Sequence, residues 1–153
     1  MLKFKKNHYT IEEVTLCGET VRFRAFRDLV YVEKPVNVEF QKMNLFVPES
    51  YYEGTSINGY DLLSAPVFMP NTVGGYMPGA NPFLQGKPNT IFRALQHGYV
   101  VASPAIRGRV QKGEDGHYNG KAPACVVDYK AAVRYLHFLA DELPGDENKI
   151  ITN

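Results

Sequence analysis

The sequence predicts an α/β protein built on a mixed β-sheet. Three observations support this class: strand-like alternation fills the first third, short apolar runs alternate with helical segments from residue 65 onward, and the composition is globular. Hydrophobic residues make up 44% of the chain and charged residues 22%, which excludes a disordered, collagen-like or coiled-coil protein. We assign one domain, with antiparallel strands and a loop at 1–64 and a β-loop-α-β-α-β series at 65–153.

The first strands are predicted to form an antiparallel hairpin. Residues 13–17 and 20–26 alternate polar and apolar side chains on either side of a turn at Gly18-Glu19. The apolar side chains of the second segment share one face, namely Val21, Phe23 and Ala25.

Two more strand-like segments follow, at 29–32 and 36–47. The second is interrupted at residues 41–44 and closed by Pro48, as at the exit of a strand. Residues 51–61 are rich in Gly, Ser, Asn and Tyr, which predicts a surface loop.

The remainder of the chain has the rhythm of a parallel sheet. Short apolar runs at 65–69, 99–103 and 149–153 predict buried parallel strands. Segments 90–97 and 123–140 predict the helices between them. Strands that alternate with helices in this way form crossover connections on the faces of a sheet.

The longer predicted helix has Pro123 in its first turn, where a missing N–H does no harm. Its predicted apolar stripe is Ala124, Val127, Ala131, Ala132, Tyr135, Phe138 and Leu139. A loop at 104–122 precedes it, and loops of this length inside a domain are more often functional than idle.

The most informative candidate site is the glycine pair that follows the run at 65–69. Gly74 and Gly75 allow a sharp turn and leave N–H groups free to bind a ligand, such as the oxyanion of an acyl-transfer reaction. The pair alone favours an ordinary turn, because paired glycines are common in turns. Tyr76 is the candidate substrate contact, and four loop tyrosines are candidates for the wall of an aromatic pocket, namely Tyr51, Tyr52, Tyr60 and Tyr76.

Two arginines open the loop at 104–122. Arg107 and Arg109 could bind a carboxylate or phosphate, or they could brace the loop by pairing with a carboxylate such as Asp128 or Asp61. Asp128 lies one turn inside the long helix, where a structural role is expected.

The residues show no metal site, no cofactor loop and no nucleophile paired with a base. We expect no catalytic role for the histidines, which are His8, His97, His117 and His137. Cys17 and Cys125 have no partners at metal-binding spacing and are expected to be free thiols, buried or half-buried. No cofactor is therefore predicted.

Charge and hydropathy limit the partners. With 17 Lys and Arg against 16 Asp and Glu, the net charge is +1, which does not favour a nucleic-acid-binding protein. No apolar run resembles a signal peptide or reaches the length of a membrane span, so we expect a soluble, cytoplasmic protein.

The order of the parts points to acyl transfer. A strand, a glycine loop, a second strand and a long helix precede the nucleophile elbow G-x-S-x-G in an α/β-hydrolase. We therefore predict an α/β-hydrolase-type mixed sheet that is incomplete, with the elbow expected just after Asn153.

Several segments also resemble a known family. Residues 65–79 resemble the oxyanion-loop region of bacterial tannases and their esterase relatives, and 97–109 resembles the strand and loop that follow. Segments within 128–153 are similar to the run that precedes the family's Gly-Thr-Ser-Ala-Gly-Gly elbow, and 44–48 and 57–60 match as well.

This resemblance implies a serine hydrolase of carboxylic esters, often galloyl or related phenolic esters, with a Ser-His-Asp triad and an inserted lid domain. It implies an oxyanion-hole role for Gly75, with Gly74 shaping the turn. The family's serine would lie three residues beyond Asn153, so the resemblance implies the N-terminal part of an enzyme that is inactive alone.

Two other functions remain open at this point. The chain could be part of a hydrolase of other acyl or peptidyl bonds, or a complete non-catalytic module that binds an anionic partner through Arg107 and Arg109. The expected partners of the esterase are a small ester substrate and the remainder of its own polypeptide. Self-association through an uncovered sheet edge is the alternative to the latter.

Overall fold

The computed structural model describes residues 2–71, 73–79 and 89–153. The strands are β1 (Thr10–Leu16), β2 (Glu19–Val30), β3 (Lys42–Pro48), β4 (Pro66–Met69), β5 (Val100–Pro104) and β6 (Asp146–Thr152). The helices are α1 (Thr90–Gln96) and α2 (Ala124–Phe138), with short 3-10 turns η1 (Val38–Phe40) and η2 (Glu49–Tyr51).

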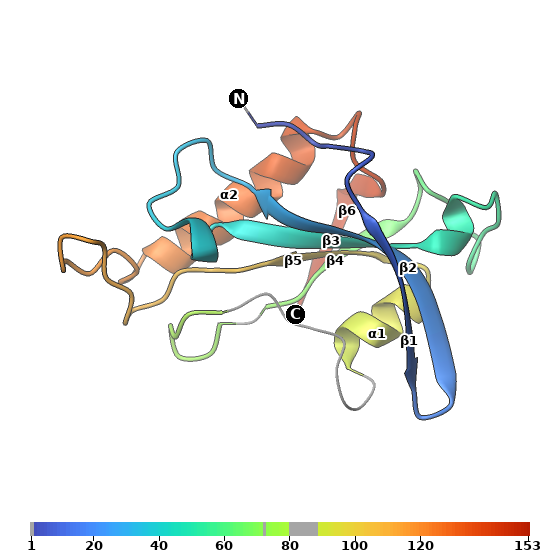
Figure 1. Cartoon of the computed structure of the whole chain (residues 1–153), viewed down its shortest axis with the longest axis horizontal. Helices are drawn as coiled ribbons and strands as arrows, with labels where there is room; N and C mark the ends of the chain where they lie inside the picture. The colour runs from blue at the N-terminus through green and yellow to red at the C-terminus, as the bar shows by residue number, and fades with distance from the viewer. Residues whose placement is uncertain (1, 72, 80–88) are drawn as a thin grey trace.

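The strands form one mixed sheet in the order β1-β2-β3-β5-β4-β6 (Figure 1). β1, β2, β3 and β5 pair as antiparallel neighbours, whereas β4 runs parallel to both β5 and β6. The predicted α/β class, with antiparallel strands first and parallel strands after them, is confirmed.

The first hairpin pairs Thr10 with Ala25 at one end and Leu16 with Glu19 at the other. Cys17 and Gly18 occupy its turn with φ angles of 51° and 81°, so the turn lies one residue earlier than predicted. Two consecutive positive φ values match the right-handed twist of a two-residue hairpin. The turn also exposes Cys17, contrary to the prediction, whereas Cys125 is buried as expected.

The segment at 36–47 is not one interrupted strand. Residues 38–40 form η1, because the Asn37 side chain accepts from the Glu39 N–H (3.1 Å) and the buried Gln41 amide oxygen accepts from the Val36 and Asn37 N–H groups (2.6 and 3.0 Å). The predicted interruption at 41–44 is wrong, since β3 begins at Lys42 and is almost wholly buried.

β6 is less buried than the sequence predicted. The sequence suggested a buried strand at 149–153, but β6 is the edge strand of the described sheet, and its residues are mostly exposed. Ile151 is 43% exposed. The apolar composition alone did not reveal the burial, because burial depends on which elements cover each side of the strand.

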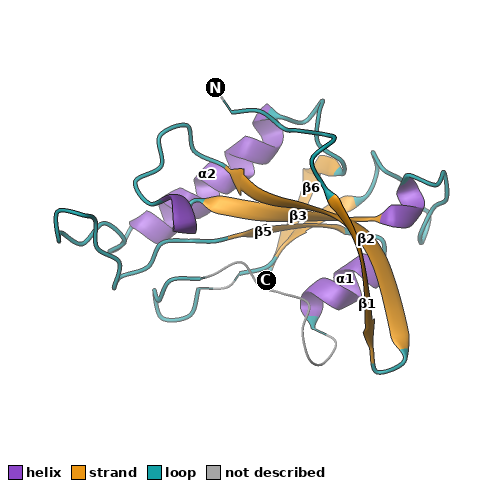
Figure 2. Ribbon diagram, viewed as in Figure 1, coloured by secondary structure: helices purple, strands orange, loops and turns teal. Residues whose placement is uncertain are grey.

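The two helices cover opposite faces of the sheet (Figure 2). Side chains alternate along each strand, so Met43, Leu45, Val67 and Val100 pack on the α2 side while Phe46, Phe68 and Val101 pack on the α1 side. The faces therefore carry two separate hydrophobic clusters, as expected for a central sheet between helices.

The buried face of α2 is shifted relative to the predicted stripe. Its buried residues are Cys125, Asp128, Ala132, Tyr135 and Leu136. Val127 and Phe138 of the predicted stripe are 51% and 61% exposed. The shift follows from Asp128, whose buried ion pair draws its side of the helix against the sheet.

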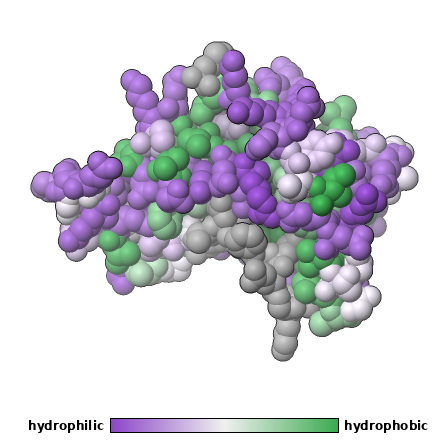
Figure 3. Space-filling view, in the orientation of Figure 1, coloured by the Kyte–Doolittle hydropathy of each residue, from purple (hydrophilic) through white to green (hydrophobic). Residues whose placement is uncertain are grey.

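On the face of the molecule shown in Figure 3, hydrophilic side chains cover most of the surface and hydrophobic ones form separate patches.

Candidate active site

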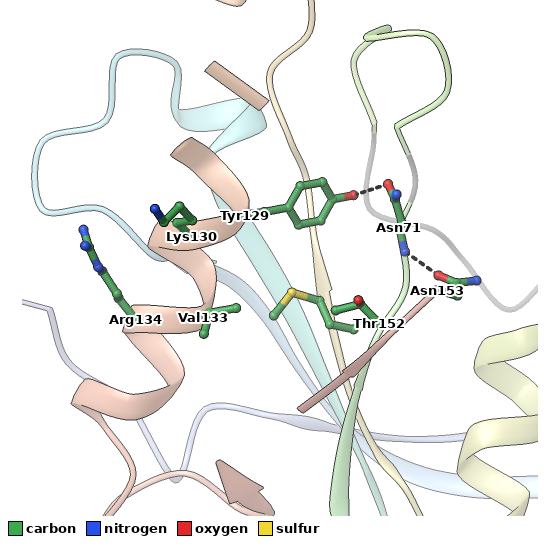
Figure 4. Close-up of a pocket in the computed structure, with 8 residues that line it drawn as sticks. Asn71, Tyr129, Lys130, Val133, Arg134, Thr152 and Asn153 are labelled. Atoms are coloured by element: carbon green, nitrogen blue, oxygen red, sulfur yellow. Dashed lines mark hydrogen bonds between the residues drawn. The ribbon is translucent and has the colours of Figure 1, made fainter. Parts of the chain in front are cut away.

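The candidate site lies where β4 and β6 end beside α2. The Asn71 N–H donates to the Asn153 side-chain oxygen (2.8 Å), and the Asn71 side-chain oxygen accepts from the Val73 N–H (3.0 Å) and the Tyr129 hydroxyl (2.7 Å) (Figure 4). These bonds tie the segments after both parallel strands to one helix. The carboxyl end of parallel strands is where α/β proteins bind ligands.

The glycine turn follows directly. The Gly74 carbonyl accepts from the Met77 N–H (3.0 Å), and Gly75 and Tyr76 both adopt left-handed backbone conformations, with φ of 58° and 60°. A left-handed tyrosine is costly by about 1–2 kcal/mol, and such outliers gather at functional sites. Among the described residues, the N–H groups of Gly74, Gly75 and Tyr76 have no hydrogen-bond acceptor. Thr72 of the predicted loop lies outside the described residues.

The loop after β5 holds this turn in place. The Arg109 N–H donates to the Tyr76 carbonyl (2.7 Å), and Gly79 and Ile106 exchange two backbone hydrogen bonds (3.1 and 2.8 Å). Gly108 fits so closely that a Cβ there would lie 2.2 Å from the Pro78 nitrogen. Position 108 must therefore be a glycine, because any side chain there would collide with the backbone at Pro78, next to the candidate site.

Arg107 has a structural role. Its guanidinium donates to both Asp128 carboxylate oxygens (2.9 and 2.8 Å) and to the Asn119 carbonyl (2.9 Å), and its own N–H also donates to Asp128 (3.1 Å). Gln41 completes the cluster by donating to Asp128 (3.0 Å). The hydrogen bond to Asp128 raises the pKa of Arg107. Asp128, not Asp61, is the partner, and Arg107 is not available to an external anion.

Two cavities adjoin the glycine turn. The turn cavity, of 250 Å³, is lined by Asn71, Val73, Gly75, Tyr76, Cys125, Val126 and Tyr129. The basic cavity, of 430 Å³, is lined by Tyr76, Arg109, Val110, Tyr118, Lys121 and Ala122. Tyr76 therefore lines both a cavity without charged side chains and a cavity with two cations.

A third cavity, the α2–β6 groove, lies next to the turn cavity and measures 390 Å³. Its lining residues are Met69, Asn71, Tyr129, Lys130, Val133, Arg134, Thr152 and Asn153, which come mainly from α2 and the ends of β4 and β6 (Figure 4). It shares Asn71 and Tyr129 with the turn cavity.

The predicted wall of four tyrosines is not formed. Tyr51 is buried and its hydroxyl donates to the Gly98 carbonyl, the centroid of the Tyr52 ring lies 3.6 Å from the Arg24 guanidinium carbon, and Tyr60 packs edge-on against Tyr99. Only Tyr76 lines the cavities described above. The other three lie at or near η2, which continues from β3 and not from β4.

Sequence reasoning missed three residues of the site, namely Asn71, Tyr129 and Asn153. The two asparagines share a signal, which is their position: Asn71 and Asn153 each lie within two residues of the end of a parallel strand, whereas Tyr129 lies within α2. An amide side chain at that place can bind the neighbouring loop, so the signal was present in the sequence.

The histidines lie apart from these cavities. His117 is paired with Asp115 (3.3 Å) at an exposed tip, and none of the four lines the turn cavity. Over residues 2–71, 73–79 and 89–153, no group of three or more His, Cys, Asp or Glu side chains could hold a metal ion. In the same part of the chain, no helix is long and apolar enough to cross a membrane.

Comparisons with known proteins give a consistent result. No protein-family model and no curated protein matches the sequence. Among solved structures, a Fusobacterium nucleatum tannase is 44% identical with a TM-score of 0.95, covering 100% of this chain and 33% of that one. A tannin acyl hydrolase in complex with ethyl gallate is 43% identical with a TM-score of 0.90, covering 98% and 34%. A Lactobacillus plantarum tannase is 43% identical with a TM-score of 0.91, covering 98% and 33%.

Proposed function

We propose, from the premise that this chain is similar to bacterial tannases along its whole length, that it forms part of a carboxylic ester hydrolase. The chain spans about a third of the length of these relatives. The observation that supports the proposal best is the identity of 42–44% to tannases, one of which holds ethyl gallate and another 3,4-dihydroxybenzoate. The substrate class we propose is accordingly a galloyl or related phenolic ester.

In this proposal the glycine turn supplies part of the oxyanion hole. Gly75 lines the turn cavity, and its N–H has no acceptor among the described residues, so in this proposal it donates to the oxygen that becomes negative. Donors fixed before the reaction stabilise the tetrahedral intermediate without reorganisation. The bonds from Asn71 to Asn153, Val73 and Tyr129 provide that rigidity.

The nucleophile is proposed to be a serine that this chain does not contribute. Attack by the serine oxygen on the ester carbonyl would form an acyl-enzyme and release the alcohol, and water would then release the acid. The base and the acid of the triad are likewise assigned to other parts of the polypeptide. We therefore expect the 153 residues alone to be inactive.

Of the alternatives, the anion-binding module keeps only one of its two candidate arginines. Arg107 is 8% exposed and satisfied by Asp128 and Asn119, which leaves only Arg109 at the surface. A hydrolase of peptidyl bonds would use the same oxyanion hole, and the choice of ester as substrate follows from the relatives.

The test uses the natural full-length polypeptide with ethyl gallate as substrate. We expect hydrolysis that is abolished by a serine-directed reagent. Gly75→Ala should lower kcat by roughly 10²–10³-fold, the effect of losing one oxyanion donor, because alanine disfavours the left-handed conformation that aims this N–H.

Gly74→Ala is the matched control. A Cβ at either glycine meets no atom within 4 Å, but only Gly75 has a positive φ. Equal losses in both variants would contradict the oxyanion role of Gly75, provided that circular dichroism shows both variants folded. A full-length protein that leaves both ethyl gallate and p-nitrophenyl esters intact would overturn the proposed function.

A further inference from the structure

Two adjacent residues of α2 hold the segments on either side of the glycine turn. After the glycines, the Tyr76 carbonyl accepts from the Arg109 N–H (2.7 Å), and the loop that carries Arg109 is bound to α2 by the buried ion pair of Asp128. Before the glycines, the Asn71 side-chain oxygen accepts from the hydroxyl of Tyr129 (2.7 Å). One turn of α2 therefore anchors both flanks of the glycine turn.

Asn71 is the centre of the flank before the glycines. Its side-chain oxygen accepts from the Val73 N–H (3.0 Å) as well as from Tyr129, and a bond to the N–H two residues on is that of an Asx turn. Its backbone N–H donates to the side-chain oxygen of Asn153, one residue beyond β6 (2.8 Å) (Figure 4). This flank is therefore bonded to itself, to α2 and to β6.

The acceptors in these bonds are amides and not carboxylates. Among the described residues, the side chains of Asn71 and Asn153 are used here as acceptors, which an aspartate could also be. A carboxylate would even be the stronger acceptor, because bonds to charged groups are stronger than bonds between neutral ones.

What distinguishes the amide is its lack of charge. None of the described residues that line the turn cavity has a charged side chain, and Asn71 is one of them. A fixed negative charge at this cavity would oppose the negative charge that develops on the oxygen of a reacting ester. An amide orders the turn without that opposition.

We infer that Asn71, Tyr129 and Asn153 are positioning residues, which hold the glycine turn in register with the end of β6 through acceptors that carry no charge. The inference rests on the proposed function, in which the Gly75 N–H is an oxyanion donor, and it assigns the groups that place this donor. The three residues act through Gly75 and not by holding the ester. Placement matters because a shift of about 1 Å in an active site can cost roughly 10²-fold in rate.

The experiment measures kcat and KM of the natural full-length protein with ethyl gallate. Asn71→Ala removes the acceptor of Val73 and Tyr129 and should lower kcat by roughly ten- to a hundredfold. Tyr129→Phe and Asn153→Ala each remove a single bond and should lower kcat by roughly three- to tenfold. KM should change much less than kcat in all three, since a donor that acts in the transition state contributes little to substrate affinity.

Asn71→Asp separates placement from charge. It keeps an oxygen for both donors, so the turn stays ordered, but it adds a negative charge at the turn cavity. We expect kcat to fall roughly tenfold, with a loss that shrinks as salt is added, because ions screen charges near solvent. An Asn71→Asp variant with the kcat of the unaltered protein would overturn the inference.

Asn37→Asp and Tyr99→Phe are the matched controls. The Asn37 oxygen accepts from the Glu39 N–H (3.1 Å), which is the same type of bond, and Asn37 does not line the turn cavity. Tyr99 is half-buried like Tyr129, but it precedes β5, whereas the loop that contacts the glycine turn follows β5. Both controls should keep the kcat of the unaltered protein, and a loss equal to that of Asn71→Asp or Tyr129→Phe would contradict the positioning role.

Hydrogen exchange followed by mass spectrometry tests the placement without any ester. Exchange over residues 73–77 should be faster in Asn71→Ala than in the unaltered protein and unchanged in Asn71→Asp. A fall in kcat in Asn71→Ala without faster exchange would overturn the inference. Faster exchange in a protein that hydrolyses no ester would contradict the proposed esterase and retain the positioning role. Hydrolysis of ethyl gallate with kcat and exchange both unchanged in Asn71→Ala would do the reverse.

Discussion

The Asp128 carboxylate connects α2 to two other parts of the chain. It accepts from Arg107, which follows β5, and from Gln41, which precedes β3, and Gln41 in turn accepts from residues 36 and 37. Its side chain is fully buried, and Tyr31 nearby donates to the Ala105 carbonyl (2.7 Å). Because charged groups are costly to bury, this cluster depends on every partner being present.

We therefore expect Asp128→Asn to lower the free energy of unfolding by roughly 3–5 kcal/mol, since it leaves the buried Arg107 without its counter-ion. Urea denaturation measures the loss. Glu19→Gln, which breaks the half-exposed pair of Arg93 and Glu19 (2.6 Å), should cost less than about 1 kcal/mol. Similar losses in both variants would contradict the structural role assigned to Asp128.

At the scale of elements, β6 and α2 leave a strand edge and apolar side chains uncovered. β6 has a neighbour on one side only within the described sheet, and the α2–β6 groove opens beside it. Val126, Val127 and Phe138 of α2 are each more than half exposed. We propose that the remainder of the polypeptide covers this region, because the relatives are about three times as long as the chain.

Without that cover, we expect the 153-residue chain to self-associate through the β6 edge. Sedimentation velocity should show dimers or larger species, and Ile151→Lys should shift them toward the monomer, because a lysine on an edge strand opposes pairing. Ile11→Lys is the matched control: it changes an isoleucine of similar exposure, 47% against 43%, on the opposite edge strand β1. A monomeric parent chain, or equal effects of both substitutions, would contradict this expectation.

At the scale of the whole molecule, buried tyrosines link stability to alkaline pH. Burial raises the pKa of Tyr51, Tyr52 and Tyr135 to about 12, from an ordinary value of 10.0, and raises the pKa of Tyr31 further. A group whose pKa is higher in the folded state binds its proton more tightly there. Its stabilising effect is therefore complete below pH 10 and is lost as the pH rises toward 12.

We expect the free energy of unfolding to fall between pH 10 and pH 12. Tyr51→Phe should reduce the slope of that fall, and it should cost about 1 kcal/mol at neutral pH because the Gly98 carbonyl loses its donor. Urea denaturation at stepped pH values measures both effects. Tyr118→Phe, at an exposed tyrosine, should leave the slope unchanged, and an equal change in both variants would count against the burial argument.

Many of the secondary-structure elements of this protein could be predicted from its sequence. Period-two alternation predicted β1 and β2 and the buried face of β2, short apolar runs predicted β4 and β5, and Gly98 was predicted to end α1. Local backbone preferences decide these features. Residues 65–79, with segments after them, carried the resemblance to tannases, and they also gave the position of the glycine turn.

Only the tertiary structure decided which groups meet. Gln41, Arg107 and Asp128 are far apart in the chain, and their buried cluster turned α2 away from its predicted stripe. Asn71, Tyr129 and Asn153 meet because β4 and β6 end side by side beneath α2. Periodicity describes one element at a time, whereas a contact between elements depends on sheet order and on what covers each edge, and neither is encoded in a local pattern.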